Sequence, residues 1–456
     1  MAAVALFSCG KVEPETEPDS GVPQSISISP LALEVPANGG SYSFTVTAPS
    51  RPSVSGVPGW FTLKDGIFNN FKLTYTLEVA VNTSVEEREV HLEVKSGGLS
   101  ATYVVKQSAA EAPSSLNPDT ELTNKSASKE AKNVYAFLRE QSGRKILSGV
   151  QSGDTANNND RVNQLFQMTG KHPALSGYDF IFLQYSPTPS GWNWVVNYGD
   201  ISAAKEQWDN GGLVSYMWHW NVPNSKTDWD NGLDGNYEGY HFYSDKTTFS
   251  IRNAITPGTW ENDFILKDIE EVAGYLKLLQ DQNIPVIWRP LHEAAGNYNL
   301  YGKTNNAWFW WGRGGADPCK SLWKLLRDKL EGEYGLDNLI WVWTLDATEG
   351  AESEWASWYP GNDLVDIVGV DIYADDTEAK ARQYDAAVNL SGGHKLVTLS
   401  ECGNIPDPSK CLAAGEAWNW FLTWDLHTYT LNTQEYWKTI MSSASVLTRE
   451  DMPSLK

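Results

Sequence analysis

The sequence predicts a (β/α)8 TIM barrel preceded by a small all-β, immunoglobulin-like sandwich. The chain has 456 residues, which corresponds to two to four domains at about 100–200 residues each. From about residue 120 onward, apolar runs alternate with helical stretches, as expected for parallel strands covered on both faces. Residues 24–108 instead alternate apolar and polar side chains with a period of two, which is typical of half-buried strands.

Eight apolar runs supply the strands of the predicted barrel. Helices are expected over 129–141, 261–282 and 321–330, where apolar residues recur at three- and four-residue spacing. A doubly wound open sheet is the alternative, but no Gly-rich phosphate loop follows the first strand. The strand candidates are 146–150, 174–179, 213–219, 286–293, 339–344, 365–371, 396–401 and 418–424.

The first part of the chain is predicted to contain a tether, a sandwich and a linker. Alternating residues predict strands at about 42–47, 73–81, 90–94 and 103–105, separated by Gly-containing turns. The Ala/Pro/Ser-rich stretch after them is typical of a linker. We therefore expect a tether over 1–23, a sandwich over 24–108, a linker over 109–119 and the barrel over 120–456.

The start of the chain resembles the lipobox of bacterial lipoproteins. A short apolar run ends in Leu6-Phe7-Ser8-Cys9 and precedes a charged, Pro-spaced stretch. In this interpretation Cys9 carries a lipid, and the protein is an exported outer-membrane lipoprotein facing the periplasm or the cell surface. The alternative is a short apolar start with an incidental cysteine. We expect contact with a membrane only through this anchor.

The composition limits the kinds of molecule that the protein can bind. The chain has 57 acidic and 35 basic residues and a net charge of −22, which argues against binding to nucleic-acid phosphates. It also has 21 Trp and 20 Tyr, whose flat apolar faces and polar edges suit sugar rings as well as cores. The histidines are dispersed, and no His/Cys/Asp cluster has ligand spacing, so we expect no metal and no cofactor. We also expect a monomer.

Two glutamates end apolar strands of the predicted barrel. Glu293 ends the fourth strand and Glu401 the seventh, and barrel active sites lie at the carboxyl ends of the strands. Paired carboxylates across one cleft are what glycoside hydrolysis needs. The alternative is that each glutamate is a solvated strand end or half of an ion pair, Glu293 for example with Arg289.

Aromatic residues gather at the same predicted rim. His219 lies between two tryptophans at the end of the third strand, Tyr373 follows the sixth, and Trp424 ends the eighth. Such residues more plausibly stack on sugars when they cluster at one rim. The loop over 221–260 is long and rich in aromatic residues, so we expect it to wall a cleft.

The combined motif closely resembles glycoside hydrolase family 26 over roughly residues 120–440. It consists of Arg289-Pro290-Leu291-His292-Glu293, Gly296, Trp308-Phe309-Trp310-Trp311-Gly312 and, downstream, Ser400-Glu401. The resemblance implies a (β/α)8 barrel, a retaining mechanism and, most often, endo-β-1,4-mannanase activity on mannan, glucomannan or galactomannan.

The same resemblance implies roles for individual residues. Glu293 matches the general acid/base and Glu401 the nucleophile. The expected substrate contacts are His292, Trp308, Tyr373, His219, Trp424, Asp179 and Trp311. One departure is that eleven residues, 297–307, separate Gly296 from Trp308, so the place of Trp308 is open.

The N-terminal module resembles the Bacteroidetes-associated carbohydrate-binding often N-terminal (BACON) domain. The residues concerned are Asn82-Thr83-Ser84, Arg88-Glu89-Val90 and the closing segment 103–107. We favour a spacer over a sugar-binding module.

Several alternatives stay open at this point. Cys402 and Cys411 could form a disulfide, although reduced, partly buried thiols are favoured for both and for Cys319. The functional alternatives are a β-1,3-xylanase, a mixed-linkage β-glucanase, or a non-catalytic surface glycan-binding lipoprotein.

Overall fold

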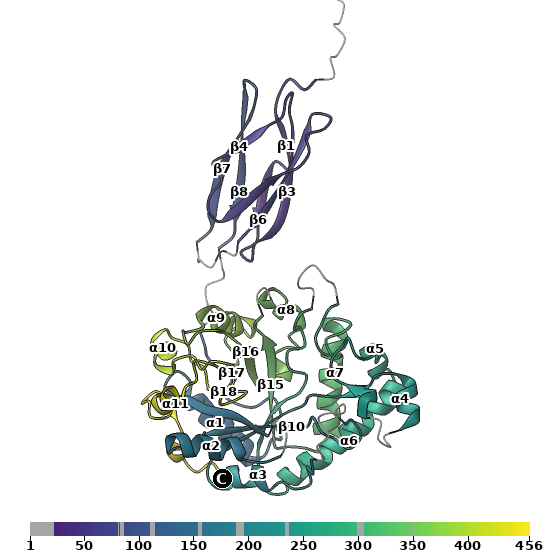
Figure 1. Cartoon of the computed structure of the whole chain (residues 1–456), viewed down its shortest axis with the longest axis vertical. Coiled ribbons are helices and arrows are strands. Elements are labelled where there is room, and N and C mark those ends of the chain that lie inside the picture. The colour runs from purple at the N-terminus through teal and green to yellow at the C-terminus, as the bar shows by residue number, and fades with distance from the viewer. Residues whose placement is uncertain are drawn as a thin grey trace, which may run out of the picture. The chain divides into compact units, whose positions relative to one another are not determined.

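The chain folds into two compact units, residues 1–112 and 113–456 (Figure 1). The computed structural model describes residues 22–80, 82, 86–109, 115–153, 157–187, 196–232, 237–298, 305–348 and 351–456. The lipobox, Cys9 and most of the predicted tether lie outside these ranges. No helix in the described ranges is long and apolar enough to cross a bilayer.

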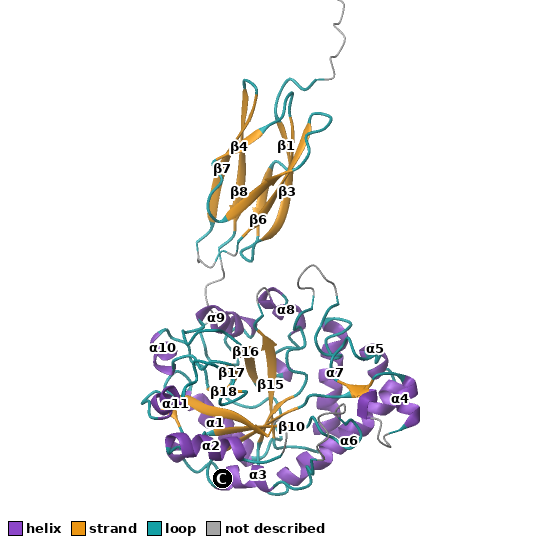
Figure 2. Cartoon of the chain, viewed as in Figure 1, coloured by secondary structure: helices purple, strands orange, loops and turns teal. Residues whose placement is uncertain are grey.

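The N-terminal unit consists of two four-stranded sheets that share one core (Figure 2). Apolar residues at alternate positions of both sheets face inward, and the ring centroids of Phe44 and Tyr103 lie 4.2 Å apart across the core. This confirms the predicted all-β sandwich. One sheet has the order β1 (Ser27–Ser29), β3 (Gly40–Thr47), β6 (Lys72–Val79) and β5 (Phe61–Asp65). The other has the order β2 (Ala32–Val35), β8 (Leu99–Gln107), β7 (Arg88–Ser96) and β4 (Ser53–Ser55).

The second unit contains a closed barrel of eight parallel strands. Closure comes from the pairing of β9 with both β18 and β10, which excludes the doubly wound open sheet. Each predicted apolar run contributes a strand, and nearly every strand residue is buried, which explains why the runs are continuous. The strands are β9 (Ile146–Gly153), β10 (Leu175–Asp179), β11 (Leu213–Met217), β14 (Val286–Arg289), β15 (Leu339–Asp346), β16 (Ile367–Ile372), β17 (Leu396–Cys402) and β18 (Trp420–Thr423). A short strand, β19 (Val446–Leu447), adds to the edge of β9.

Helices surround the barrel and follow the predicted periodicity. The helix expected over 129–141 is α1, and the helix expected over 261–282 is α6. The helix expected over 321–330 begins earlier, because the polar start of α7 has the composition of a loop. The helices are α1 (Lys129–Gln141), α2 (Asp160–Thr169), α3 (Ser202–Asp209), α6 (Trp260–Gln280), α7 (Ala316–Arg327), α8 (Trp355–Trp358), α9 (Ala381–Leu390), α10 (Pro408–Ala413) and α11 (Gln434–Met441).

The long excursion between β11 and α6 has structure of its own. It contains a two-stranded ribbon and two short helices, so it has regular secondary structure instead of forming an irregular loop. Its elements are β12 (Val222–Pro223), α4 (Lys226–Asn231), β13 (Tyr240–His241) and α5 (Ile251–Ala254).

Two expectations differ from the structure in detail. The strand predicted over 286–293 ends at Arg289, because the chain turns sharply after it. Cys402 and Cys411 are both buried free thiols, as is Cys319, so the alternative of a disulfide between Cys402 and Cys411 is wrong. Burial raises the pKa of all three thiols, which keeps them protonated.

Candidate active site

Glu401 lies at the carboxyl end of β17, where two donors fix its carboxylate. Arg289 Nη2 donates to Oε1 over 2.5 Å, and the Tyr373 hydroxyl donates to Oε2 over 2.6 Å. Glu401 is 4% exposed and Arg289 is 1% exposed, so water screens this ion pair little. The alternative pairing of Arg289 with Glu293 is wrong, because the guanidinium faces Glu401 and Asp371.

Glu293 lies in a tight turn beyond the end of β14. Its φ is 51° and that of Leu291 is 53°, in the left-handed region that non-glycine residues rarely adopt. The Glu293 backbone N–H donates to the carbonyl oxygen of Thr344 on β15 over 3.2 Å. Strained backbone of this kind concentrates at functional sites. Here the turn carries Glu293 back over the mouth of the barrel.

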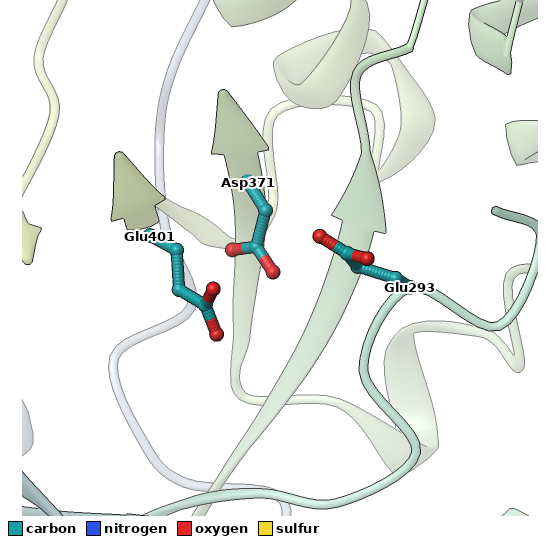
Figure 3. Close-up of side chains that lie close together, drawn as sticks. All are labelled: Glu293, Asp371 and Glu401. Carbon is teal, nitrogen blue, oxygen red and sulfur yellow. The ribbon is translucent and has the colours of Figure 1, made fainter. Parts of the chain in front are cut away.

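Three carboxyl groups meet at this mouth, with Asp371 lying between the two glutamates in the close-up (Figure 3). One oxygen from each of Glu293, Asp371 and Glu401 lies within 4.8 Å of the others. Asp371 Oδ1 accepts a hydrogen bond from Ser400 over 2.7 Å and lies 3.5 Å from Arg289 Nη1. Arg289 therefore supplies a positive charge to both Asp371 and Glu401.

The electrostatics of this cluster favour protonation of Glu293. Burial raises the pKa of Glu293 well above its usual range, and the negative charges of Asp371 and Glu401 raise it further. Burial and the charge of Glu401 also raise the pKa of Asp371 well above its usual range, although Arg289, Ser400 and a hydrogen bond from Glu293 oppose that rise. The arrangement thus keeps one carboxyl protonated beside an arginine-paired carboxylate, the division that acid–base work requires.

Asp371 was not among the sequence candidates, although the signal was present. It ends an apolar strand in the same manner as Glu401, and the two face each other in the register of β16 and β17. Asp371 could have been identified as a further carboxylate at the carboxyl end of a barrel strand.

His219 and His292 extend the polar floor of the site. Their ring centroids lie 4.6 Å apart in an edge-to-face arrangement. Burial, the neighbouring His219 and Arg289 lower the pKa of His292, so its imidazole is neutral at neutral pH.

Asp179 acts behind His219 and does not face the cleft. Both of its carboxylate oxygens are engaged by His219: Oδ1 accepts the backbone N–H over 2.9 Å, and Oδ2 lies 2.6 Å from Nδ1. Asp179 is only 1% exposed. The expectation that it contacts substrate directly is therefore corrected: it orients the imidazole of His219.

Trp311 is likewise a supporting residue. Its side chain is fully buried, and its Nε1–H donates to the carbonyl oxygen of His292 over 3.0 Å. The expected direct contact with substrate is corrected, because the indole instead fixes the backbone beside Glu293. The spacing of the motif could not separate its buried tryptophans from its accessible one.

The excursion after β11 is joined to the segment that contains Trp308–Gly312. Ser244 N–H donates to Trp308 O over 2.7 Å, and Trp310 N–H donates to Phe242 O over 3.1 Å. Tyr243 pairs with Phe309 in a β-bridge, stacks on its ring, and is 44% exposed. Burial raises the pKa of its phenol, and the carboxyl groups of Asp245 and Glu293 contribute to the rise. The predicted wall therefore stands at the catalytic mouth.

Comparison with known proteins agrees with this geometry. Residues 123–451 match the model of glycosyl hydrolase family 26. The chain belongs to glycosyl hydrolase family 26.

Relatives in family 26 cover the same region. Mannan endo-1,4-beta-mannosidase B of a Piromyces species is 35% identical over 357 residues, which is 76% of this chain and 56% of that protein. The chain thus spans little more than half the length of this relative. The family 26 domain of a Prevotella bryantii endo-β-mannanase/endo-β-glucanase is 36% identical, with a TM-score of 0.64 over 73% of this chain and 99% of that domain. A β-mannanase from a symbiotic protist of the termite Reticulitermes speratus, complexed with a gluco-manno-oligosaccharide, is 34% identical, with a TM-score of 0.61 over 74% of this chain and 99% of that chain.

The insertion of residues 297–307 leaves Trp308 in contact with Gly296. The two ends of the insertion lie close together, because Asn297 Nδ2 donates to Asn306 O over 2.8 Å. Residues 299–304 lie outside the described ranges. Trp308 N–H donates to Gly296 O over 3.1 Å, and a Cβ on Gly296 would lie 2.6 Å from the indole. Trp308 is partly buried beside the turn that carries Glu293. Glycine at 296 allows this close approach.

Proposed function

We propose that this chain is a retaining, endo-acting glycoside hydrolase that cleaves β-1,4-mannosidic bonds in mannan, glucomannan or galactomannan. The observation that carries the proposal is the pair of carboxyl groups, Glu293 and Glu401, with oxygens within 4.8 Å of each other. Retaining glycosidases hold their two carboxyl groups about 5–5.5 Å apart, whereas inverting ones need about 6.5–9.5 Å to admit a water molecule.

The two glutamates take different roles in this proposal. Glu401, which pairs with Arg289, attacks the anomeric carbon and forms a covalent glycosyl-enzyme. Glu293 gives its proton to the departing glycosidic oxygen, then accepts a proton from the water that cleaves the intermediate. The Tyr373 hydroxyl holds Glu401 in position for the attack.

The proposed sugar contacts surround this pair: Tyr373, Trp424, His219 and Trp308 are at least partly accessible, and His292 is buried beside Glu293. Tyr373 is 48% exposed at the mouth, and Trp424 and His219 have ring centroids 5.8 Å apart at its edge. Trp308 lies on the Glu293 side, and His292 stands next to His219. Flat rings and imidazoles suit the alternating apolar and hydroxyl faces of a sugar.

A substrate panel tests the proposal. Incubating the protein with galactomannan, glucomannan, lichenan and β-1,3-xylan, with Glu401→Ala as control, should release mannooligosaccharides from the two mannans alone. Products from lichenan or xylan would show that the substrate is one of the alternative polysaccharides and not mannan. Retention on a mannan gel without any product would instead favour a binding protein.

Asp371→Asn should move the alkaline limb of the pH–rate profile to lower pH. The negative charge of Asp371 helps to raise the pKa of Glu293, so its removal lets Glu293 lose its proton at lower pH. We expect a shift of about one pH unit in kcat/KM, with activity lost earlier as pH rises. Asp363→Asn, an exposed aspartate before β16, is the matched control. An unmoved limb would show that Asp371 does not tune Glu293.

We also propose that the protein is an exported, monomeric outer-membrane lipoprotein anchored through Cys9. The lipobox-like sequence and the charged stretch after it support this proposal. In a bacterial host, wild type should enter the membrane fraction and incorporate labelled palmitate, whereas Cys9→Ser should not. Equal labelling of the two would overturn the anchor.

The N-terminal sandwich is proposed to be a BACON-like spacer. It has its own core and forms its own compact unit, which supports a role as a spacer between the barrel and an anchor. A chain lacking residues 1–112 should keep its rate on soluble mannan and its affinity for insoluble mannan. Weaker affinity would favour a sugar-binding module.

A further inference from the structure

The Tyr373 hydroxyl donates a hydrogen bond to Glu401, although Tyr373 is 48% exposed. An exposed phenol on two free torsions loses conformational entropy when it is held in one orientation. A neighbouring group that limits its motion would therefore support the hydrogen bond to the nucleophile. In the described part of the chain, its aromatic neighbour is Tyr429, whose ring centroid lies 5.9 Å away at 45°.

Tyr429 comes from the loop after β18 and is held close to Gly403. A Cβ on Gly403 would lie 2.8 Å from Tyr429 Cε1 and 3.3 Å from Tyr373 Cδ1. The two rings thus close over the same glycine, two residues beyond Glu401. The absence of a side chain at 403 lets Tyr429 reach Tyr373.

Two buried asparagines fix this loop to its neighbours. Asn432 donates to Gly403 O over 2.8 Å and accepts from Ile405 N–H over 2.9 Å. Asn404 accepts from Leu431 N–H over 3.1 Å and donates to Ala374 O over 2.9 Å. These hydrogen bonds connect the segments that follow β16, β17 and β18. They therefore fix the backbones that carry Tyr373 and Tyr429 relative to each other.

We propose that Tyr429 is a positioning residue, whose ring restrains Tyr373 so that the Tyr373 hydroxyl stays on Glu401. The inference rests on the proposed role of Glu401 as nucleophile. Tyr429 acts through Tyr373 chiefly by contact of its ring, which phenylalanine would keep, although a hydrogen bond with Tyr373 also acts on its hydroxyl. Phenylalanine should therefore replace it far better than alanine.

A double-mutant cycle tests this assignment on whichever polysaccharide the wild type cleaves. Tyr429→Ala should lower kcat about tenfold with little change in KM, and Tyr429→Phe should restore most of the rate. In a Tyr373→Phe background, Tyr429→Ala should cost almost nothing further, because the bond that it protects is already gone. Thr430→Ala, an exposed residue of the same loop, is the matched control.

Gly403→Ala provides a second variant in case Tyr429→Ala folds poorly. The added methyl group displaces the Tyr429 ring without deleting it, so kcat should fall in the same way. In the Tyr429→Ala background the same substitution should have a smaller effect, which is that of the looser 3.3 Å approach to Tyr373 alone. Full additivity of Tyr429→Ala with Tyr373→Phe would overturn the inference. An inactive wild type would instead contradict the proposed function.

Discussion

Replacing Glu401 by alanine abolishes turnover while polysaccharide binding persists. We expect the rate to fall by about 10⁴-fold or more, because no other group can form the covalent intermediate. Binding should survive, since the aromatic rim contributes contacts that do not depend on Glu401. Initial rates and mobility in a galactomannan-containing native gel measure the two effects separately.

The control must separate loss of the nucleophile from loss of fold. Alanine leaves the buried Arg289 without its closest partner, which is destabilising. Glu401→Gln keeps the volume of the side chain and should be equally inactive with a smaller change in thermal stability. Glu435→Ala, on the exposed face of α11, is the matched glutamate control. More than a few per cent of the wild-type rate in either Glu401 variant would refute the assignment.

Replacing Glu293 by alanine makes the rate depend on the leaving group. Hydrolysis of mannan should fall by about 10²–10⁴-fold, because the glycosidic oxygen departs without a proton. An aryl glycoside with a dinitrophenolate leaving group needs no such proton, so its first step should stay fast. Water attack is then slow without a base, and the glycosyl-enzyme should accumulate in intact-protein mass spectra.

Azide distinguishes the two glutamates. A small anionic nucleophile needs no general base, so it should restore turnover of the aryl glycoside by Glu293→Ala and release a β-glycosyl azide. The same anion with Glu401→Ala should instead give the α-product, because it attacks in place of the missing carboxylate. If Glu293→Ala lost equal rate on activated and natural substrates, the role of general acid would be wrong.

The barrel could be predicted because its strands are buried along their whole length. Continuous apolar runs such as that of β15 leave little ambiguity, and their alternation with helices fixes the class. The shorter strands of the sandwich were harder. β1 and β4 have three residues each and mostly exposed side chains, so they carry almost no apolar signal.

The candidate site was predicted in part for the same reason. A carboxylate that follows an apolar run is conspicuous, which identified Glu293 and Glu401. Contacts across the barrel are not visible in a linear sequence. The alternative considered for Arg289 therefore paired it with the near glutamate, Glu293, whereas its guanidinium contacts Glu401. The same limit concealed the roles of Asp179 and Trp311, since burial behind a histidine depends on tertiary packing.

The junction between the excursion after β11 and the Trp308–Gly312 segment matters for redesign. Backbone hydrogen bonds through Ser244 and Trp310 tie the two segments, and Arg313 donates to Thr247 O over 2.6 Å. A graft that exchanged one segment for that of another hydrolase would leave several of these donors and acceptors unmatched. The two segments therefore form one structural unit. A loop exchange meant to change the substrate range has to transfer residues 240–248 and 305–313 together.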